Sequence, residues 1–313
     1  MNVVLIPFFL AARIVTDTTW EFGPEYIFQV QVNSTAIPED GAYGSVRLNL
    51  TSKLICQPKG ARTLSCHFQD SKADSFVTET LDPEVPAIPV SQVCRQEAYE
   101  INQDQFEIRF TETGLDSLIV NENIQPRELD MIRVIVGQLN IGVIVWDKNE
   151  DMFRLMENFT QGECITTFRL NRTIVDHDLY SNHDYVLEST FGLKDNQLVQ
   201  IHKIRNLHIC THIVPYFFGS AEGLRQVSDL YSTVSSSDSY ILITSTEFIS
   251  GTSNVITTSK MTETMMTTLY ENISLRLESI HPAEGEPPEV KDAEHASIFI
   301  GRWLMESSSE EDA

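Results

Sequence analysis

The segment NIQPRELDMIRVIVGQLNIG, residues 123–142, decides the fold that we predict for this chain. Its apolar residues recur at the spacing of one helical face, at Leu129, Ile132, Val136 and Leu139. Pro126 and the acidic residues behind it are typical of a first helical turn, and Gly142 can end the helix. Because Val134 and Ile135 widen the apolar surface, we expect a helix that is buried on more than one side.

The segments around this helix show the alternation of strands with one buried face. Between Glu25 and Val32 apolar side chains alternate with polar ones, and further strand candidates follow along the chain. These candidates are residues 46–50, 106–110, 199–205, 240–243 and 273–280. A single buried helix among many strands predicts a mainly β fold, either an antiparallel β-barrel or a curled sheet around one central helix.

Composition changes in the second half of the chain. Residues 228–268 are rich in Ser and Thr, which suits strands with polar outer faces and also suits an O-glycosylated stretch. The proline-rich run from Pro282 to Pro288 is typical of a linker, and residues 307–312 form a solvated acidic tail. We therefore divide the chain into residues 1–16, a β domain over residues 17–281, and an acidic linker and tail over residues 282–313.

The charge balance restricts the partners of the chain. The 313 residues include 45 acidic and 22 basic side chains, which gives a formal net charge of −23. Phosphate would be repelled by such a surface, so the chain as a whole is not expected to bind nucleic acid. Any anionic partner must use a local basic region.

Two features indicate export from the cell. The apolar run Val3–Ala12 has the length of a signal-peptide core and is too short to span a bilayer, so we predict a signal peptide over residues 1–16 and a secreted protein without a membrane span. The alternative for this run is a buried strand. N-glycosylation sequons begin at five asparagines: Asn33, Asn49, Asn158, Asn171 and Asn272.

The chain has five cysteines, which in an oxidising compartment should mostly pair. Cys56 and Cys66 flank the turn signal at residues 58–60, so these two can face each other across adjacent strands. An odd total leaves one cysteine free or bonded to another chain, and the sequence does not identify the partner of Cys94.

Catalytic motifs are missing, so we predict that the chain is not an enzyme and has neither a cofactor nor a metal. Two groups of residues could imitate a metal site. Asp176, His177, Asp178 and His183 are read as a polar surface loop instead. His208, Cys210 and His212 would point the same way along a strand, but a disulfide at Cys210 would consume the thiolate that zinc requires.

A compact basic region overlaps the second group. It contains His202, Lys203, Arg205 and His208, and it is the only such region in a strongly acidic chain. It can dock an acidic partner, for example an acidic ligand-binding repeat of an endocytic receptor. The alternative is an ordinary polar face of a strand.

Several motifs, taken in order, resemble the vitellogenins, the egg-yolk lipoprotein precursors of the large lipid-transfer-protein family. The first is Trp20–Tyr26, which precedes a hydrophobic strand. The second combines Phe106–Phe110, Gly114–Val120 and the end of the helix at Gln138–Gly142. The similarity continues through Gly162–Cys164, then Lys203–Leu207 leading to Cys210, and Tyr216–Gly219.

The resemblance to the vitellogenins implies features of fold and function that the residue periodicity alone does not predict. It implies an N-terminal β-barrel curled about a central helix, a disulfide between Cys164 and Cys210, and a role in receptor recognition and dimer contacts. In that family the lipid is enclosed by a helical domain and two further sheets, which do not follow Ala313 here. Since the barrel is filled by its helix, we expect this chain alone to hold little bulk lipid.

We therefore expect a vitellogenin-like secreted lipid-transport protein whose N-terminal module binds a receptor or partner, with a nutrient-reservoir role. The expected partners are an endocytic receptor of the lipoprotein-receptor type, a second copy in a homodimer, and lipid through the missing lipid-cavity domains if the chain is part of a longer protein. The alternative is a free-standing secreted glycoprotein with a recognition or immune role and no lipid carriage.

Overall fold

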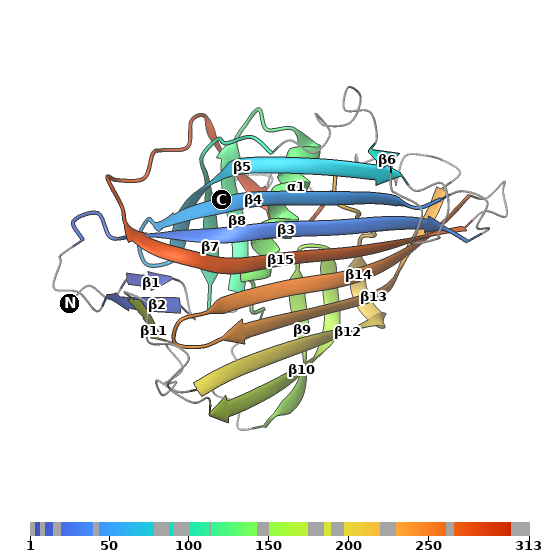
Figure 1. The fold of residues 1–313 in the computed structure, drawn as a ribbon. Coiled ribbons are helices and arrows are strands. Elements are labelled where there is room, and N and C mark those ends of the chain that lie inside the picture. The colour runs from blue at the N-terminus through green and yellow to red at the C-terminus, as the bar shows by residue number, and fades with distance from the viewer. Residues whose placement is uncertain are drawn as a thin grey trace, which may run out of the picture.

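A computed structural model describes residues 4–6, 10–14, 20–39, 44–77, 88–89, 101–112, 114–142, 150–174, 185–188, 197–219, 230–260 and 266–301. Within these residues, strands dominate and one α-helix is present (Figure 1). The loop around Asp176, His177, Asp178 and His183, the acidic run at 307–312, and Cys94 lie outside the described residues.

Most strands belong to one antiparallel sheet of thirteen strands. In order across the sheet they are β16 (Ala293–Ser297), β8 (Gly114–Asn121), β7 (Phe106–Thr111), β5 (Thr63–Val77), β4 (Val46–Pro58), β3 (Pro24–Pro38), β15 (Met266–Pro282), β14 (Phe248–Lys260), β13 (Leu230–Ile243), β12 (Gln197–Ile213), β10 (Gly162–Ile174) and β9 (Met152–Phe159), and β6 (Ile88–Pro89) pairs with β5. The Ser/Thr-rich stretch supplies β13 and β14, which confirms the strand interpretation for its described residues.

A second, small sheet contains β1 (Val4–Ile6), β2 (Leu10–Ile14) and β11 (Tyr185–Glu188). The backbone N–H of Leu187 donates to Ser245 O at 2.6 Å, in the turn between β13 and β14. Both β1 and β2 lie within the range for which a signal peptide is predicted, and the cleavage of residues 1–16 stays a prediction.

Alternation along β3 builds the core as expected. Tyr26, Phe28, Val30 and Val32 are fully buried on the inner face, while Gln29 and Gln31 between them are exposed. The ring of Phe28 meets Phe248 of β14 edge to face, with 6.2 Å between the ring centres. The inner faces of strands from both halves of the sheet therefore share one core.

The helix α1 (Pro126–Val136) lies on the inner side of this curve, with the long strands β3, β4, β5 and β15 in front of it in Figure 1. Every residue from Leu129 to Val136 is buried, which confirms a central helix covered on several sides. The helix ends before the predicted stop at Gly142: a 3-10 turn, η3 (Gly137–Leu139), follows, and Asn140 is extended. A Cβ at residue 137 would lie 2.9 Å from Thr160 Cγ2, so a larger residue there would force the Thr160 side chain to shift.

The fold class is confirmed in its curled-sheet form. The hydrogen-bonded ladder runs from β16 to β9 and, among the described strands, does not close into a barrel. The two ends nevertheless approach each other, because the backbone N–H of Ile300, beyond β16, donates to Thr160 O beside β9 at 2.8 Å.

Residues 283–301, which we call the C-terminal strap, make this approach possible. Figure 1 shows the strap as the red-orange trace that turns back from the end of β15. Its first half is tied along the sheet: Ala283 N donates to Gly23 O, Gln57 Nε2 donates to Gly285 O, and Lys59 Nζ bonds Glu289 at 2.7 Å. These bonds lie within the range that the sequence assigns to a linker and tail.

The second half of the strap becomes β16 and then reaches the helix. β16 pairs with β8, and Ala296, Ile298 and Ile300 are buried. Arg133 Nε of α1 donates to Ser297 O at 2.8 Å, and Asp130 Oδ1 accepts from Gly301 N at 3.3 Å. The buried ion pair between Asp130 and Arg133 therefore also holds the end of the strap.

The strap should unfold together with the core rather than as a tail. We expect Ile298→Ala to lower the free energy of unfolding by about 2 to 5 kcal/mol, because it removes a buried aliphatic side chain and leaves a cavity. Urea denaturation measures this change. The control is His295→Ala, which alters an exposed side chain of β16. Equal stabilities of the two variants would contradict a strap that is part of the core.

Candidate functional site

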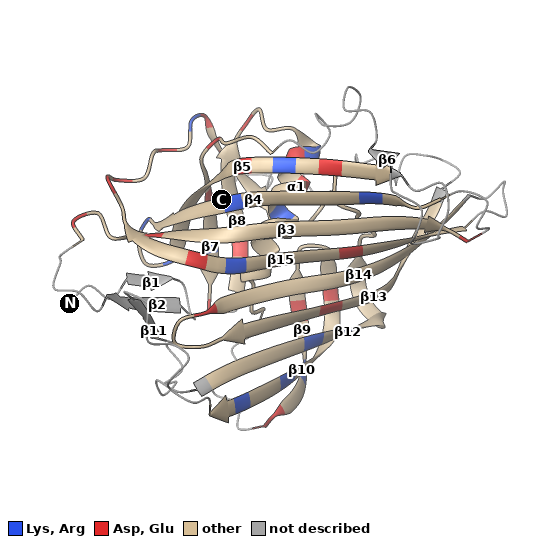
Figure 2. Cartoon of the chain, in the orientation of Figure 1, with Lys and Arg blue, Asp and Glu red and all other residues tan. Residues whose placement is uncertain are grey.

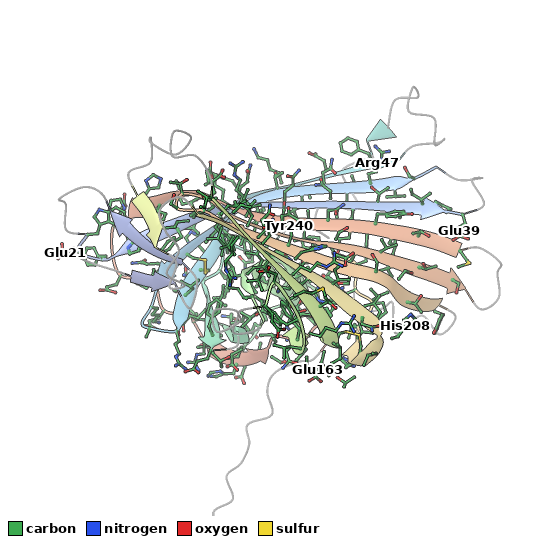
Figure 3. All side chains as sticks on the ribbon, turned by 90° about the horizontal axis from the view of Figure 1, so that it is seen from below. Glu21, Glu39, Arg47, Glu163, His208 and Tyr240 are labelled. Carbon is green, nitrogen blue, oxygen red and sulfur yellow. A yellow bond between two sulfur atoms is a disulfide. The ribbon has the colours of Figure 1, made fainter. Side chains whose placement is uncertain are left out.

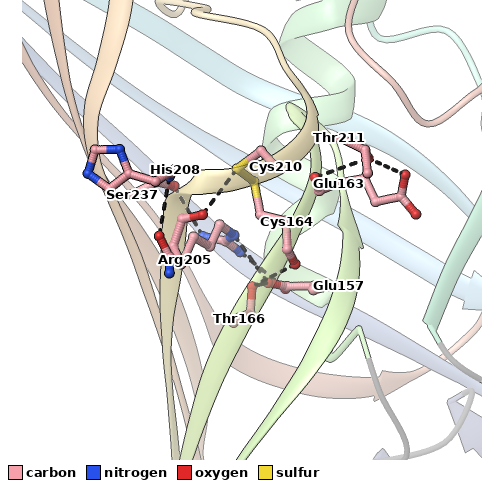
Figure 4. Close-up of a disulfide and its surroundings, with 10 residues drawn as sticks. Glu157, Glu163, Cys164, Thr166, Arg205, His208, Cys210, Thr211 and Ser237 are labelled. Carbon is pink, nitrogen blue, oxygen red and sulfur yellow. Dashed lines mark hydrogen bonds and ion pairs between the residues drawn. A yellow bond between two sulfur atoms is a disulfide. The ribbon is translucent and has the colours of Figure 1, made fainter.

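A fully buried carboxylate, Glu157 of β9, lies at the centre of a charged group on the inner face of the sheet. Figure 4 shows it beside Thr166 and Arg205. Lys203 Nζ lies 2.9 Å from Glu157 Oε1, and Arg205 Nε lies 3.1 Å from Oε2. Thr166 Oγ1 donates to Oε2 at 2.9 Å. We call Glu157, Thr166, Lys203 and Arg205 the Glu157 cluster.

Strand pairing explains why these residues meet. β10 pairs with β9 on one side and with β12 on the other, so side chains from all three strands share the inner face. Alternation places Glu157 between the buried Phe153 and Phe159, and it places Lys203 and Arg205 in line with the buried Val199 and Ile201.

Arg205 connects the cluster to the next strand. Its Nη1 donates to Ser237 Oγ at 3.2 Å and to Ser239 Oγ at 2.8 Å, both on β13. The guanidinium lies over the ring of Phe159, 4.2 Å from its centre, where the face of the ring attracts a cation. Arg205 of β12 therefore links β13 to β9.

Lys203 connects the cluster to the segment after the helix. Its Nζ donates to Asn140 O at 2.6 Å, and the Asn140 side chain accepts from Leu115 N at 3.0 Å and donates to Asn158 O at 2.9 Å. Gly142 has φ of 83° and lies against Glu157, where a side chain would meet the glutamate at 2.9 Å.

The electrostatics of the cluster follow from burial and pairing. Burial disfavours the charged form of Glu157, but Arg205, Lys203 and Thr166 together outweigh this effect and hold the pKa of Glu157 below its ordinary value. Burial lowers the pKa of Lys203, and the nearby Arg205 acts in the same direction, while Glu157 opposes both. Glu157 is therefore ionised at neutral pH. Because it is fully buried, its charge is stabilised by Arg205, Lys203 and Thr166.

The contacts of the Glu157 cluster are suited to holding the strands together rather than to catalysis. Each charge of the cluster is buried and faces a partner of opposite charge or a hydrogen-bonding group. Among the residues that the structure describes, no three His, Cys, Asp or Glu side chains are placed to hold a metal ion. The thiolate of Cys210 is consumed by a disulfide, so the His208, Cys210 and His212 group lacks the zinc ligand that it would need.

The prediction of a basic docking region is wrong for Lys203 and Arg205, its two strongest cations. Lys203 and Arg205 are 2% and 7% exposed and point into the core, so they cannot reach an acidic partner. His202 and His208 are exposed, and Figure 3 shows His208 at the periphery. Figure 2 shows Lys and Arg dispersed over the strands. The sequence contained a signal for this difference. Residues 203 and 205 continue the alternation of the apolar Val199 and Ile201 and so share their buried face, whereas residue 202 lies on the opposite face.

Both predicted disulfides are present. Cys56 and Cys66 are direct partners in the register of β4 and β5, with 4.2 Å between their Cα atoms. Cys164 and Cys210 join β10 to β12 with 4.0 Å between their Cα atoms, at a point where the register of the two strands shifts twice. The second disulfide lies one residue from the exposed Ile209.

All five sequon asparagines lie on the outer face of the large sheet. Asn49, Asn158, Asn171 and Asn272 are exposed and Asn33 is half-buried. Three of them form one row across β15, β3 and β4, because Asn272 pairs with Asn33 and Asn33 pairs with Asn49. The structure places these side chains where glycans can be accommodated, and glycosylation itself stays a prediction.

Comparison with known proteins identifies the family. Residues 20–283 match the model of the vitellogenin N-terminal domain, and the chain belongs to this family. The solved structure described as lipid-protein interactions in lipovitellin is similar to it with a TM-score of 0.60 and 12% identity, over 91% of this chain and 28% of that chain. The translocator domain of the autotransporter NalP from Neisseria meningitidis aligns with 82% of this chain and 89% of that chain at 7% identity. Its TM-score of 0.20 is too low to indicate a shared fold.

Family membership confirms the resemblance to the vitellogenins that the motifs indicate. The chain spans about a quarter of the lipovitellin chain that it matches. No helix in the described ranges has the length and apolar character needed to cross a membrane.

The Glu157 cluster should be a major source of stability. We expect Glu157→Gln to lower the free energy of unfolding by about 3 to 5 kcal/mol, because it leaves two buried cations without their counter-charge. Urea denaturation at neutral pH measures this loss. Arg154→Gln, an exposed position on the opposite face of β9, is the matched control. A loss no larger than that of the control would show that the cluster contributes nothing.

Proposed function

We propose that this chain is the recognition module of a secreted lipid-transport protein, and that it binds its partners on its surface rather than lipid in its interior. The observation that carries the proposal is the position of α1, which is buried along Leu129–Val136 on the inner side of the curled sheet. A core packed with helix and strand side chains leaves the outer surface as the place for binding. Family membership supplies the link to lipid transport.

The proposed partner is an endocytic receptor of the lipoprotein-receptor type. Lys203 and Arg205 are not part of this contact. The described surface nearest to the predicted region is the stretch of β12 beyond its pairing with β13, where His208 and Ile209 are exposed and the disulfide to Cys164 holds the backbone. Dimer contacts and a nutrient-reservoir role are proposed on family membership alone.

Secretion and N-glycosylation form the second part of the proposal. Two disulfides are consistent with an oxidising compartment, and the vitellogenin family is a secreted one. The placement of all five sequons on one face supports glycosylation, because a glycan on the inner face would prevent the core from forming.

Lipid content tests the first part. We expect lipid extraction from the purified native chain to yield phospholipid well below one molecule per chain, since α1 and the core fill the inner side of the sheet. Quantitative phosphate analysis of the extract measures this ratio, with an unrelated secreted protein from the same culture as control. Stoichiometric phospholipid would contradict a module that leaves bulk carriage to other parts of the transporter.

Glycopeptide mass spectrometry tests the second part. After secretion from eukaryotic cells, we expect glycans at the exposed sequons, and we expect Asn49→Gln to remove the glycan of its own peptide only. Asn206→Gln is the control, because Asn206 is exposed but does not begin a sequon. A secreted wild-type chain without any glycan would reject the assignment, and retention of the chain in the cells would reject secretion.

A further inference from the structure

Three buried polar residues meet on neighbouring strands at another point of the inner face. Ser34 of β3 pairs with Glu271 of β15, and Glu271 pairs with Asn254 of β14. Each of the three residues is about 1% exposed. They therefore form one row across three strands, which we call the Glu271 row.

The Glu271 row contains atoms whose hydrogen-bonding needs are not met by the described residues. Glu271 Oε2 accepts from the backbone N–H of Phe218 at 2.6 Å. Glu271 Oε1, Asn254 Oδ1 and Ser34 Oγ form no hydrogen bond with any described group. Leaving a buried polar atom unpaired is costly, so three such atoms side by side require a physical explanation.

The direction of the hydrogen bonds around Asn254 provides an explanation for these unpaired atoms. Gln161 Nε2 donates to Tyr216 O at 3.3 Å, and this carbonyl oxygen can only accept. Gln161 therefore offers its Oε1 to Asn254, and Asn254 Nδ2 donates to it at 3.2 Å. Asn254 keeps a second amide N–H and its acceptor Oδ1, and Oδ1 is the atom that has no partner. An ionised Glu271 would leave Oδ1 and Glu271 Oε1 as two unpaired acceptors on neighbouring strands.

We propose that Glu271 carries a proton in the folded protein and donates it from Oε1 to Asn254 Oδ1, so that the row acts as a pH-responsive latch on residues 214–219. The proton completes a chain of donors that runs from Glu271 through Asn254 and Gln161 to Tyr216. The same carboxyl group holds Phe218 through its other oxygen. The protonation state of Glu271 thus acts on the hydrogen bonds that lead to Tyr216, whereas Oε2 can accept from Phe218 in either state.

The surroundings of Glu271 favour this state. Burial raises the pKa of Glu271 to about 7, although the Phe218 N–H, which donates to Oε2, favours its charged form. From residues 214–219 it is faced by Tyr216, whose own pKa is raised well above its ordinary value by burial and by Asp130 and Glu271. Ser34 and Asn254, which pair with it from β3 and β14, carry no charge. In the described part of the chain no cation forms an ion pair with Glu271.

The sign of the pH effect follows from linkage. Because the folded state holds the proton more tightly than the unfolded state, the stability that this group contributes is complete below a pH of about 4.5 and is lost as pH rises to about 7. Glu157 behaves in the opposite way, since its pKa is lowered. The two buried glutamates therefore act in different pH ranges.

The test compares Glu271→Gln with the wild-type chain in urea denaturation at about pH 5 and about pH 8. The glutamine amide can donate to Asn254 while its oxygen still accepts from Phe218, so it imitates the protonated acid at any pH. We expect the folded-to-unfolded ratio of this variant, relative to wild type, to rise by roughly tenfold to a hundredfold between the two pH values. A constant ratio would overturn the proposal.

Two further measurements complete the test. Glu278→Gln changes an exposed carboxylate of the same strand and should leave the pH profile unchanged, and a shift equal to that of Glu271→Gln would overturn the assignment to residue 271. If Glu271→Gln does not fold, infrared spectroscopy of the wild type decides. A neutral carboxylic acid band that disappears near pH 7 supports the proposal, and its absence at about pH 5 overturns it.

Discussion

The burial of one helix on several sides is the constraint on which the rest of the fold depends. A helix whose residues 129–136 are all buried needs neighbours around it, and a sheet can supply them only by curling. Two of those buried residues, Asp130 and Arg133, are charged, and they pair with each other and with backbone groups of the strap. The helix thus determines both the curvature of the sheet and the path of the chain after β15.

Polar groups inside the curve give the core its specificity. The Glu157 cluster connects β9, β10, β12 and β13 and reaches Asn140 after the helix, whereas the Glu271 row connects β3, β15 and β14 with residues 214–219. The turn before β10 lies between them, since Gln161 bonds Asn254 and Glu157 lies on the preceding strand. Such networks tolerate few alternative registers, because a shift of one residue would turn every charge to the wrong face.

How much the sequence could predict depended on the range of the interaction. Alternation in β3, the helix, and the disulfide between Cys56 and Cys66 are local patterns, and all were predictable. The ion pair of Glu157 with Lys203 joins residues 46 positions apart through β10, and no pattern in the sequence announces that pairing. The basic region was misjudged because charge was counted along the chain, whereas alternation assigns residues 202 and 203 to opposite faces. The strand in the strap escaped detection because a proline-rich run precedes it.

Because of the strap, the folded unit extends beyond the region of family similarity. Family similarity ends at residue 283, yet the chain beyond it covers the helix, extends the sheet beside β8 and bonds the turn at Thr160. A fragment cut at the limit of the similarity would expose the apolar positions that Ile298 and Ile300 cover and would leave the edge of β8 unpaired. Exposed apolar surface beside an open strand edge favours self-association. The smallest piece of this protein suited to expression is therefore longer than the piece that homology recognises.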